Sequence, residues 1–327
     1  MTRAALVTCG GDPFLALMML KLFERWQDEV DKLYICFNAD LDINVANYVK
    51  SRYDKNEKTE FIYVDHGLGF GIPFNKCLEA GEEELILLLE DDGFIYEKGL
   101  VDRMFKKIEG GAVDAIGSPR FSCTDGIAKR TKERYALDYS GSGDKGPNFW
   151  PNFFFVKRED LMKTDLDFAG KGWAKGEKIK ELDLTVEDTE CGDPFVWMCI
   201  QLRAMGLRFL DVGQRHAMPT EIEDIKTKAF NYEHGYFGWI HGGSLSSGWN
   251  GFLDGKFTAA PVNDYATQEL ESRVAFWRIA GDLEVYDEIK EFKNKYFEGI
   301  DNMVKHYKMN PARIQKKVNI WKALMKL

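Results

Sequence analysis

Short apolar runs alternate with segments of helical length along the first part of the chain. The runs hold apolar residues at consecutive positions, which is typical of strands covered on both faces of a sheet. The pattern therefore predicts a mainly parallel sheet sandwiched by helices, an α/β fold. The expected strands are Ala4–Cys9, Lys32–Asn38, Phe61–Val64 and Leu85–Leu89, and the expected helices are Phe14–Trp26, Ile43–Tyr53 and Pro73–Ala80.

The predicted elements become shorter after residue 111. Strands are expected over Ala112–Gly117 and Phe149–Val156, and the segment Tyr139–Pro147 between them is expected to be a loop. A helix is expected over Asp193–Met205, because Asp193 can act as its N-cap, a proline follows at the first helical position, and a glycine stands just past its end.

Loops are expected after Thr220, where glycines and aromatic residues are interleaved, and helices from about Asn263 to the end. Asn310 and Pro311 have the residue types of a cap and first turn for the last helix. We therefore expect a first domain over residues 1–258, whose two halves meet at about residue 117, and a C-terminal helical extension over residues 259–327.

Composition narrows the class of protein. Of the 327 residues, 45% are hydrophobic and 13% aromatic, which is enough to bury a large core and excludes a disordered chain. No apolar run approaches the roughly 20 residues that a membrane-spanning helix needs. The N-terminal residues lack the apolar core of a signal peptide, and the six cysteines form no CxxC pair, so we expect a cytoplasmic protein with free thiols.

Charge is segregated along the chain. The formal net charge is −9, which argues against a surface built for nonspecific binding of nucleic acid. Residues 303–327 nevertheless hold seven lysine and arginine residues and no acid. Apolar residues recur at helical spacing in the same segment, so the last helix is predicted to be basic and amphipathic. It could pack within the protein or between subunits, lie on an anionic membrane surface, or contact an anionic polymer.

Three acids, Glu90, Asp91 and Asp92, directly follow the apolar run Leu85–Leu89. Adjacent carboxylates repel one another, so a fold that brings them together usually supplies a cation, and a divalent metal is the natural candidate. Ligands of open α/β sheets also collect at the carboxyl ends of the strands. The alternative is a solvated turn that starts a helix at Phe94, where carboxylates suit the helix dipole.

The order of these features resembles the GT-A fold of nucleotide-sugar glycosyltransferases, especially the broad family 2 type with its DxD motif. The resemblance covers about residues 4–250. It implies transfer of a sugar from a nucleoside-diphosphate sugar to a hydroxyl acceptor, with a nucleotide-binding half near residues 1–117 and an acceptor half near 118–258. The positions that carry it are Thr8, Asn38, Asp40, Asp65, Asn75 and the triplet Glu90, Asp91 and Asp92.

The resemblance also implies roles for the acids. Glu90 and Asp91 would face the nucleoside, and Asp92 would bind Mn²⁺ or Mg²⁺. In inverting members an acid at the start of a later helix deprotonates the acceptor hydroxyl. Asp193 fits that position, with Glu190 next and Asp188 third, although helix capping alone would also explain Asp193.

A histidine in the segment "WIHGGSLSSGW" is the candidate third metal ligand. Members of the family place a late histidine beside the metal or the phosphates, and His241 resembles it, with His216 as its rival. A hydrogen-bonded structural histidine is the alternative. Trp150 and Trp173 are the candidates for stacking against a sugar or base on the acceptor side, where core packing is the alternative.

Other enzyme classes find little support in the sequence. The Gly67, Gly69 and Gly71 run lacks the third glycine of the dinucleotide fingerprint, and no P-loop, HExxH or GxSxG motif occurs. A sugar-phosphate nucleotidyltransferase and a non-catalytic glycan-binding or nucleotide-binding module remain as alternatives. The acceptor stays open between a glycan, a protein, a lipid-linked sugar and a hydroxylated base in viral DNA.

Overall fold

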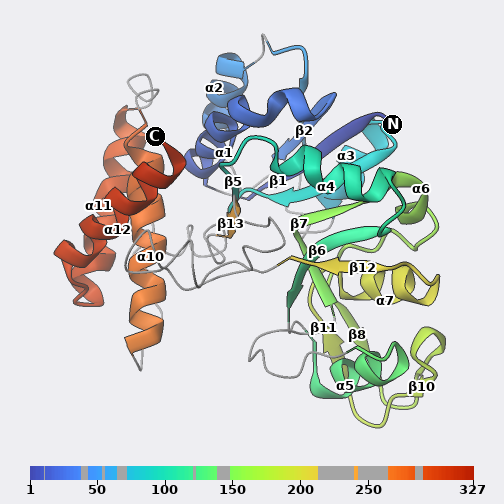
Figure 1. Ribbon diagram of the computed structural model, residues 1–327. Helices are drawn as coiled ribbons and strands as arrows, with labels where there is room; N and C mark the ends of the chain where they lie inside the picture. The colour runs from blue at the N-terminus through green and yellow to red at the C-terminus, as the bar shows by residue number, and fades with distance from the viewer. Residues whose placement is uncertain are drawn as a thin grey trace.

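The computed structural model describes residues 1–10, 12–37, 43–53, 56–64, 72–120, 123–137, 148–212, 239–241, 264–283 and 290–327. Within these residues a seven-stranded sheet occupies the centre of the molecule, and the C-terminal helices stand beside it (Figure 1). The expected loops over Tyr139–Pro147 and after Thr220 lie largely outside the described residues. The predicted division at residue 258 stays a prediction.

The central sheet is mainly parallel, as expected. One strand, β7, runs antiparallel to both of its neighbours, β4 and β6, and every other neighbouring pair is parallel. In spatial order the strands are β3 (Thr59–Tyr63), β2 (Lys32–Phe37), β1 (Arg3–Cys9), β4 (Leu85–Glu90), β7 (Asn148–Lys157), β6 (Ala115–Arg120) and β12 (Phe209–Asp211).

Helices cover both faces of this sheet. Alternate residues of a strand point to opposite faces, so Ala5 and Val7 of β1 join one apolar cluster, while Ala4 and Leu6 join the other. Helices α1, α2 and α4 pack in the first cluster, and α3, α6 and α7 in the second. Their bounds are α1 (Pro13–Trp26), α2 (Ile43–Tyr53), α3 (Ile72–Ala80), α4 (Leu100–Glu109), α6 (Arg158–Leu161) and α7 (Val196–Ala204).

A smaller unit forms a third apolar cluster under the sheet (Figure 1). It joins α5 (Asp125–Arg134) to short antiparallel pairs of strands. In this unit β8 (Lys171–Trp173) pairs with β11 (Glu190–Gly192), and β9 (Lys178–Ile179) pairs with β10 (Leu184–Thr185) across η2 (Lys180–Leu182). The short helix η1 (Gln27–Glu29) lies outside the unit and follows α1.

The helix expected from Asp193 starts three residues later, at Val196. Phe195 adopts φ +72°, a left-handed conformation that cannot continue a helix. Its ring is held by stacking on Phe168 and an edge contact with Phe154. Asp193 therefore lies in the turn before α7, and its predicted role as N-cap was wrong. The end was predicted correctly, because Gly206 follows at φ +83°.

The C-terminal helices share the core of the first sheet face. They are α10 (Asp264–Gly281), α11 (Lys290–His306) and α12 (Pro311–Met325). The predicted cap of α12 is confirmed, because Oδ1 of Asn310 accepts from the backbone N–H of Ala312 at 3.0 Å. None of the described helices is long and apolar enough to cross a membrane.

The amphipathic helix α12 packs inside the protein. Its apolar face is buried against α10, and Lys317, a member of the basic set, is only 5% exposed. Lys317 donates from Nζ to the hydroxyl of Ser272 at 3.3 Å, and Nε of Arg313 lies 3.1 Å from Oε2 of the buried Glu271. The apolar face is therefore not available to lie on a membrane, whereas contact of the exposed lysines with an anionic polymer stays a prediction.

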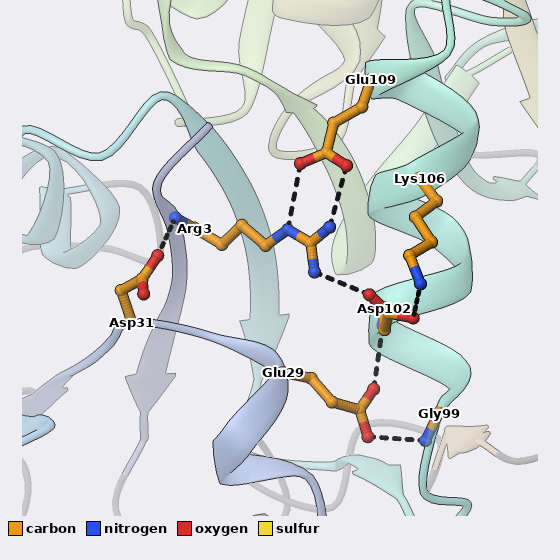
Figure 2. A network of polar contacts seen from close by, with 7 residues as sticks. All are labelled: Arg3, Glu29, Asp31, Gly99, Asp102, Lys106 and Glu109. Carbon is orange, nitrogen blue, oxygen red and sulfur yellow. Dashed lines mark hydrogen bonds and ion pairs between the residues drawn. The ribbon is translucent and has the colours of Figure 1, made fainter.

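A polar network fastens α4 to the amino end of the sheet (Figure 2). Nη1 of Arg3 in β1 donates to Asp102 at 2.9 Å, and Nε and Nη2 donate to the two carboxylate oxygens of Glu109 at 3.2 and 2.9 Å. Glu29 accepts from the backbone N–H groups of Gly99 at 2.6 Å and Asp102 at 2.9 Å. Its carboxylate thus satisfies free donors at the positive end of α4.

Candidate active site

The acid triplet lies at the carboxyl end of β4 and is buried. Glu90 is 7% exposed, Asp91 1% and Asp92 2%, and the strand β5 (Gly93–Ile95) follows directly. The alternative of a solvated turn that starts a helix at Phe94 was therefore wrong. Buried carboxyl groups are shielded from water, so they stay ionised only where the protein or a ligand supplies positive charge or hydrogen-bond donors, and otherwise they take up a proton.

Backbone groups of β1 and the loop after it hold Asp91 in place. The backbone N–H of Asp91 donates to the carbonyl of Thr8 at 3.1 Å, and the N–H of Gly10 donates to Oδ2 of Asp91 at 2.8 Å. Thr8 also stands opposite Glu90 in the parallel ladder of β1 and β4 and is 6% exposed. The structure therefore brings the predicted residue Thr8 together with the acids.

A further buried acid, Asp12, stands close to this group. Its Oδ1 caps α1 by accepting from the N–H groups of Phe14 at 2.9 Å and Leu15 at 3.4 Å, and the hydroxyl of Tyr296 donates to Oδ2 at 3.2 Å. Burial raises the pKa of Asp12 to about 7. Burial also raises the pKa of Asp91 well above its usual range, and the negative charges of Asp92, Asp12 and Glu90 raise it further.

Carboxylate oxygens are the ligands that Mn²⁺ and Mg²⁺ prefer, so the triplet fits such an ion in chemistry. Within the described residues, no three side chains of the metal-binding types are arranged to hold one. The side chain of the predicted ligand His241 lies outside that set. The backbone of His241 is described: β13 (Trp239–His241) pairs antiparallel with β5, and this pairing places His241 opposite Gly93, the residue after Asp92.

The other predicted donor contacts are only partly described. Nδ2 of Asn75 in α3 donates to the carbonyl of Leu166 at 3.0 Å, which fastens that helix to the loop after α6. The predicted residues Asn38, Asp40 and Asp65 and the alternative ligand His216 lie outside the described residues.

The turn that holds Asp193 is tied to the start of β7. Gly192 forms a β-bridge with Cys123, and Nδ2 of Asn148 donates to the sulfur of Cys123 at 3.2 Å. Burial raises the pKa of Cys123 to about 12, and the charges of Asp193 and Glu190 raise it as well. Asp193 itself is exposed.

Glu190 is engaged at the start of α5. The hydroxyl of Thr124 donates to its carboxylate, and the same carboxylate occupies the space that a side chain at Gly126 would need. On the acceptor side, Trp173 is 1% exposed and packs edge-on against Trp197 with ring centroids 6.1 Å apart. Trp150 lies in β7, and its side chain is not among those described.

One residue of this region was missed by the sequence analysis. Asn152 of β7 is fully buried, and its backbone carbonyl oxygen lies 2.6 Å from the position that a Cβ atom on Gly93 would take. Within the described residues neither Nδ2 nor Oδ1 of Asn152 has a hydrogen-bond partner. The available signal was a polar residue inside the predicted strand Phe149–Val156.

Comparison with known proteins gives fold-level matches alone. No family model and no curated protein sequence matches the chain. A mannosyltransferase from Pyrobaculum calidifontis, solved with GDP-Man and Mn²⁺, is similar at 11% identity and TM-score 0.43, over 98% of this chain and 74% of that one. TarS 1–349 from S. aureus with UDP-GlcNAc is similar at 11% identity and TM-score 0.41, over 99% and 80% of the two chains. Likenesses this distant carry no information on substrate or mechanism.

Proposed function

We propose that this protein is a metal-dependent glycosyltransferase that moves a sugar from a nucleoside-diphosphate sugar to a hydroxyl acceptor. The observation that carries the proposal is the buried triplet Glu90, Asp91 and Asp92 at the carboxyl end of β4. Buried adjacent carboxylates need a cation or strong donors close by to stay ionised. A divalent ion that also binds a diphosphate meets this need at the sheet edge where α/β folds bind their ligands.

In this proposal Asp92 and His241 hold Mn²⁺ or Mg²⁺. The bound metal supplies positive charge to the diphosphate that leaves. Glu90 and Asp91 face the nucleoside, and the bond from Gly10 to Asp91 fixes the loop after β1 next to them. The other proposed contacts of the donor are Thr8, Asn38, Asp40, Asp65 and Asn75.

Asp193 is the proposed base that takes the proton of the acceptor hydroxyl, with inversion at the sugar carbon. Asp193 is exposed, and the hydroxyl of Thr124 donates to the carboxylate of Glu190. The segment of β7 from Asn148 to Asn152 runs from the bridge beside Asp193 to the contact beside Asp92. From Asn148 to Asn152 an extended chain spans at most about 14 Å. In this proposal the diphosphate and the sugar lie along this strand.

The test is a turnover assay with a panel of nucleotide sugars and Mn²⁺ or Mg²⁺, in which released nucleoside diphosphate is measured. We expect Asp193→Asn to keep donor binding and lose transfer. Glu190→Gln is the matched control from the same segment, and it should keep transfer. Unchanged turnover in Asp193→Asn would contradict the assignment of the base, and donor binding without any turnover in the wild type would favour a non-catalytic binding module.

A further inference from the structure

Asn152 is an unused polar group in the core of the candidate site. It is fully buried, and within the described chain both its amide nitrogen and its amide oxygen lack a hydrogen-bond partner. Most buried side-chain polar atoms in proteins are hydrogen-bonded, because a buried group without a partner destabilises the fold. The two unused atoms of Asn152 therefore need an explanation that packing alone does not supply.

The position of Asn152 in the sheet narrows what it could bind. The residues proposed to contact the donor, apart from Asn75 on α3, lie on or just after β1, β2, β3 and β4 in the sequence. Asn152 lies on β7, on the other side of β4. The backbone carbonyl of Asn152 packs on Gly93, the residue after Asp92. Four residues earlier in β7, Asn148 donates to Cys123, which is bridged to Gly192, the residue before Asp193. Asn152 thus lies between the proposed metal ligand and the proposed base.

The chemistry of the amide narrows the ligand further. A phosphate oxygen only accepts, so it would satisfy Nδ2 and leave Oδ1 unused, and a metal ion would use Oδ1 alone. A hydroxyl group both donates and accepts, so it can satisfy the two amide atoms together with a neighbouring group. Sugar rings carry such hydroxyls, and the sugar is the part of the donor that lies between the diphosphate and the acceptor.

We propose that the side chain of Asn152 binds a hydroxyl group of the transferred sugar and so helps to determine which sugar is used. This inference rests on the proposed function and deepens it. The acids of the triplet, which the proposed function places against the donor, are nearly as buried as Asn152. A site that hydrogen-bonds a hydroxyl discriminates strongly against an analogue that lacks it, because its buried polar groups are then left unpaired.

The test compares Asn152→Leu with the wild type and with Phe154→Leu. Leucine has nearly the shape of asparagine but forms no hydrogen bonds. Phe154→Leu is the control for packing, since Phe154 is buried on the same strand among Phe149, Phe195 and Phe209. For each protein the melting temperature, the Kd of the free nucleoside diphosphate with Mn²⁺, and kcat/KM for the donor sugar and its monodeoxy analogues are measured.

We expect Asn152→Leu to melt no lower than the wild type and to bind the free nucleotide unchanged, while kcat/KM for the donor falls about tenfold or more. One deoxy analogue should be discriminated by the wild type and not by Asn152→Leu. A lower melting temperature with full sugar discrimination would overturn the inference and make Asn152 a structural residue. If wild-type protein neither binds nor turns over any nucleotide sugar, the proposed function fails first, and this inference with it.

Discussion

Replacing Asp12 with asparagine tests the electrostatics of the region around the acid triplet. Asp12 is fully buried, and burial raises the pKa of its carboxyl to about 7 from the ordinary value of 3.8. Asparagine caps helices as well as aspartate does, so Asp12→Asn keeps an oxygen for the N–H groups of Phe14 and Leu15. The substitution therefore removes a buried charge and leaves the cap.

The sign of the effect follows from proton linkage. Between pH 4 and 7 the unfolded chain has lost the proton of Asp12 while the folded protein still holds it, so stability contributed by this group falls as pH rises to about 7. At roughly 1.4 kcal/mol per pH unit, the difference between the two pKa values corresponds to at most about 4 kcal/mol. Asp12→Asn should thus be more stable than the wild type at pH 8, and nearly equal to it at pH 4.

Urea unfolding followed by tryptophan fluorescence at pH 4, 6 and 8 measures this difference, since Trp26 and Trp277 are buried reporters. The substitution also removes one of the negative charges that raise the pKa of Asp91. A difference in the free energy of unfolding that stays constant with pH, or a variant that is less stable at pH 8, would refute the reasoning.

Three further substitutions test single contacts, two near the site and one at the amino end of the sheet. Gly93→Ala should destabilise the protein by about 1–3 kcal/mol, because the new Cβ would lie 2.6 Å from the backbone carbonyl oxygen of Asn152. The control Gly172→Ala, which has open space around it, should be near neutral in the same urea titration. Tyr296→Phe should lower the free energy of unfolding by about 1 kcal/mol, because the hydroxyl that donates to the buried Asp12 is lost; an unchanged unfolding midpoint would contradict this bond. Arg3→Met should cost about 1–2 kcal/mol, because Glu109 loses the ion pair with Arg3 and Asp102 keeps only the one with Lys106, and this loss should shrink in high salt.

The sequence predicted the central sheet well for a physical reason. Strands covered on both faces appear as continuous apolar runs, and Leu85–Leu89 ends one residue short of the observed β4. The position of the acids at the end of that strand followed from the same run. The cap at Asn310 was equally readable, because capping depends on neighbouring residues alone.

Features that depend on distant contacts were not readable. The left-handed Phe195 is held by rings from elsewhere in the chain, so local capping signals placed the start of α7 too early. Lys317 is one of the basic residues of the last helix, yet it is buried, where it donates to the hydroxyl of Ser272 and lies near the negative charge of Glu271 on α10. Asn152 carries no motif, and only the three-dimensional structure reveals that its amide is buried without a hydrogen-bond partner in the part of the chain that is described.

Thermal unfolding with free nucleoside diphosphates and nucleotide sugars, with and without Mn²⁺, tests the central claim most directly. A ligand that binds the native state alone stabilises it by mass action, by about 2.7 kcal/mol at a concentration one hundred times Kd. We predict that one nucleotide and its sugars raise the melting temperature of the wild type only with Mn²⁺, and that Asp92→Asn folds but loses this shift. An equal shift in Asp92→Asn, or no shift with any nucleotide in the wild type, would contradict a metal-dependent donor site at the end of β4.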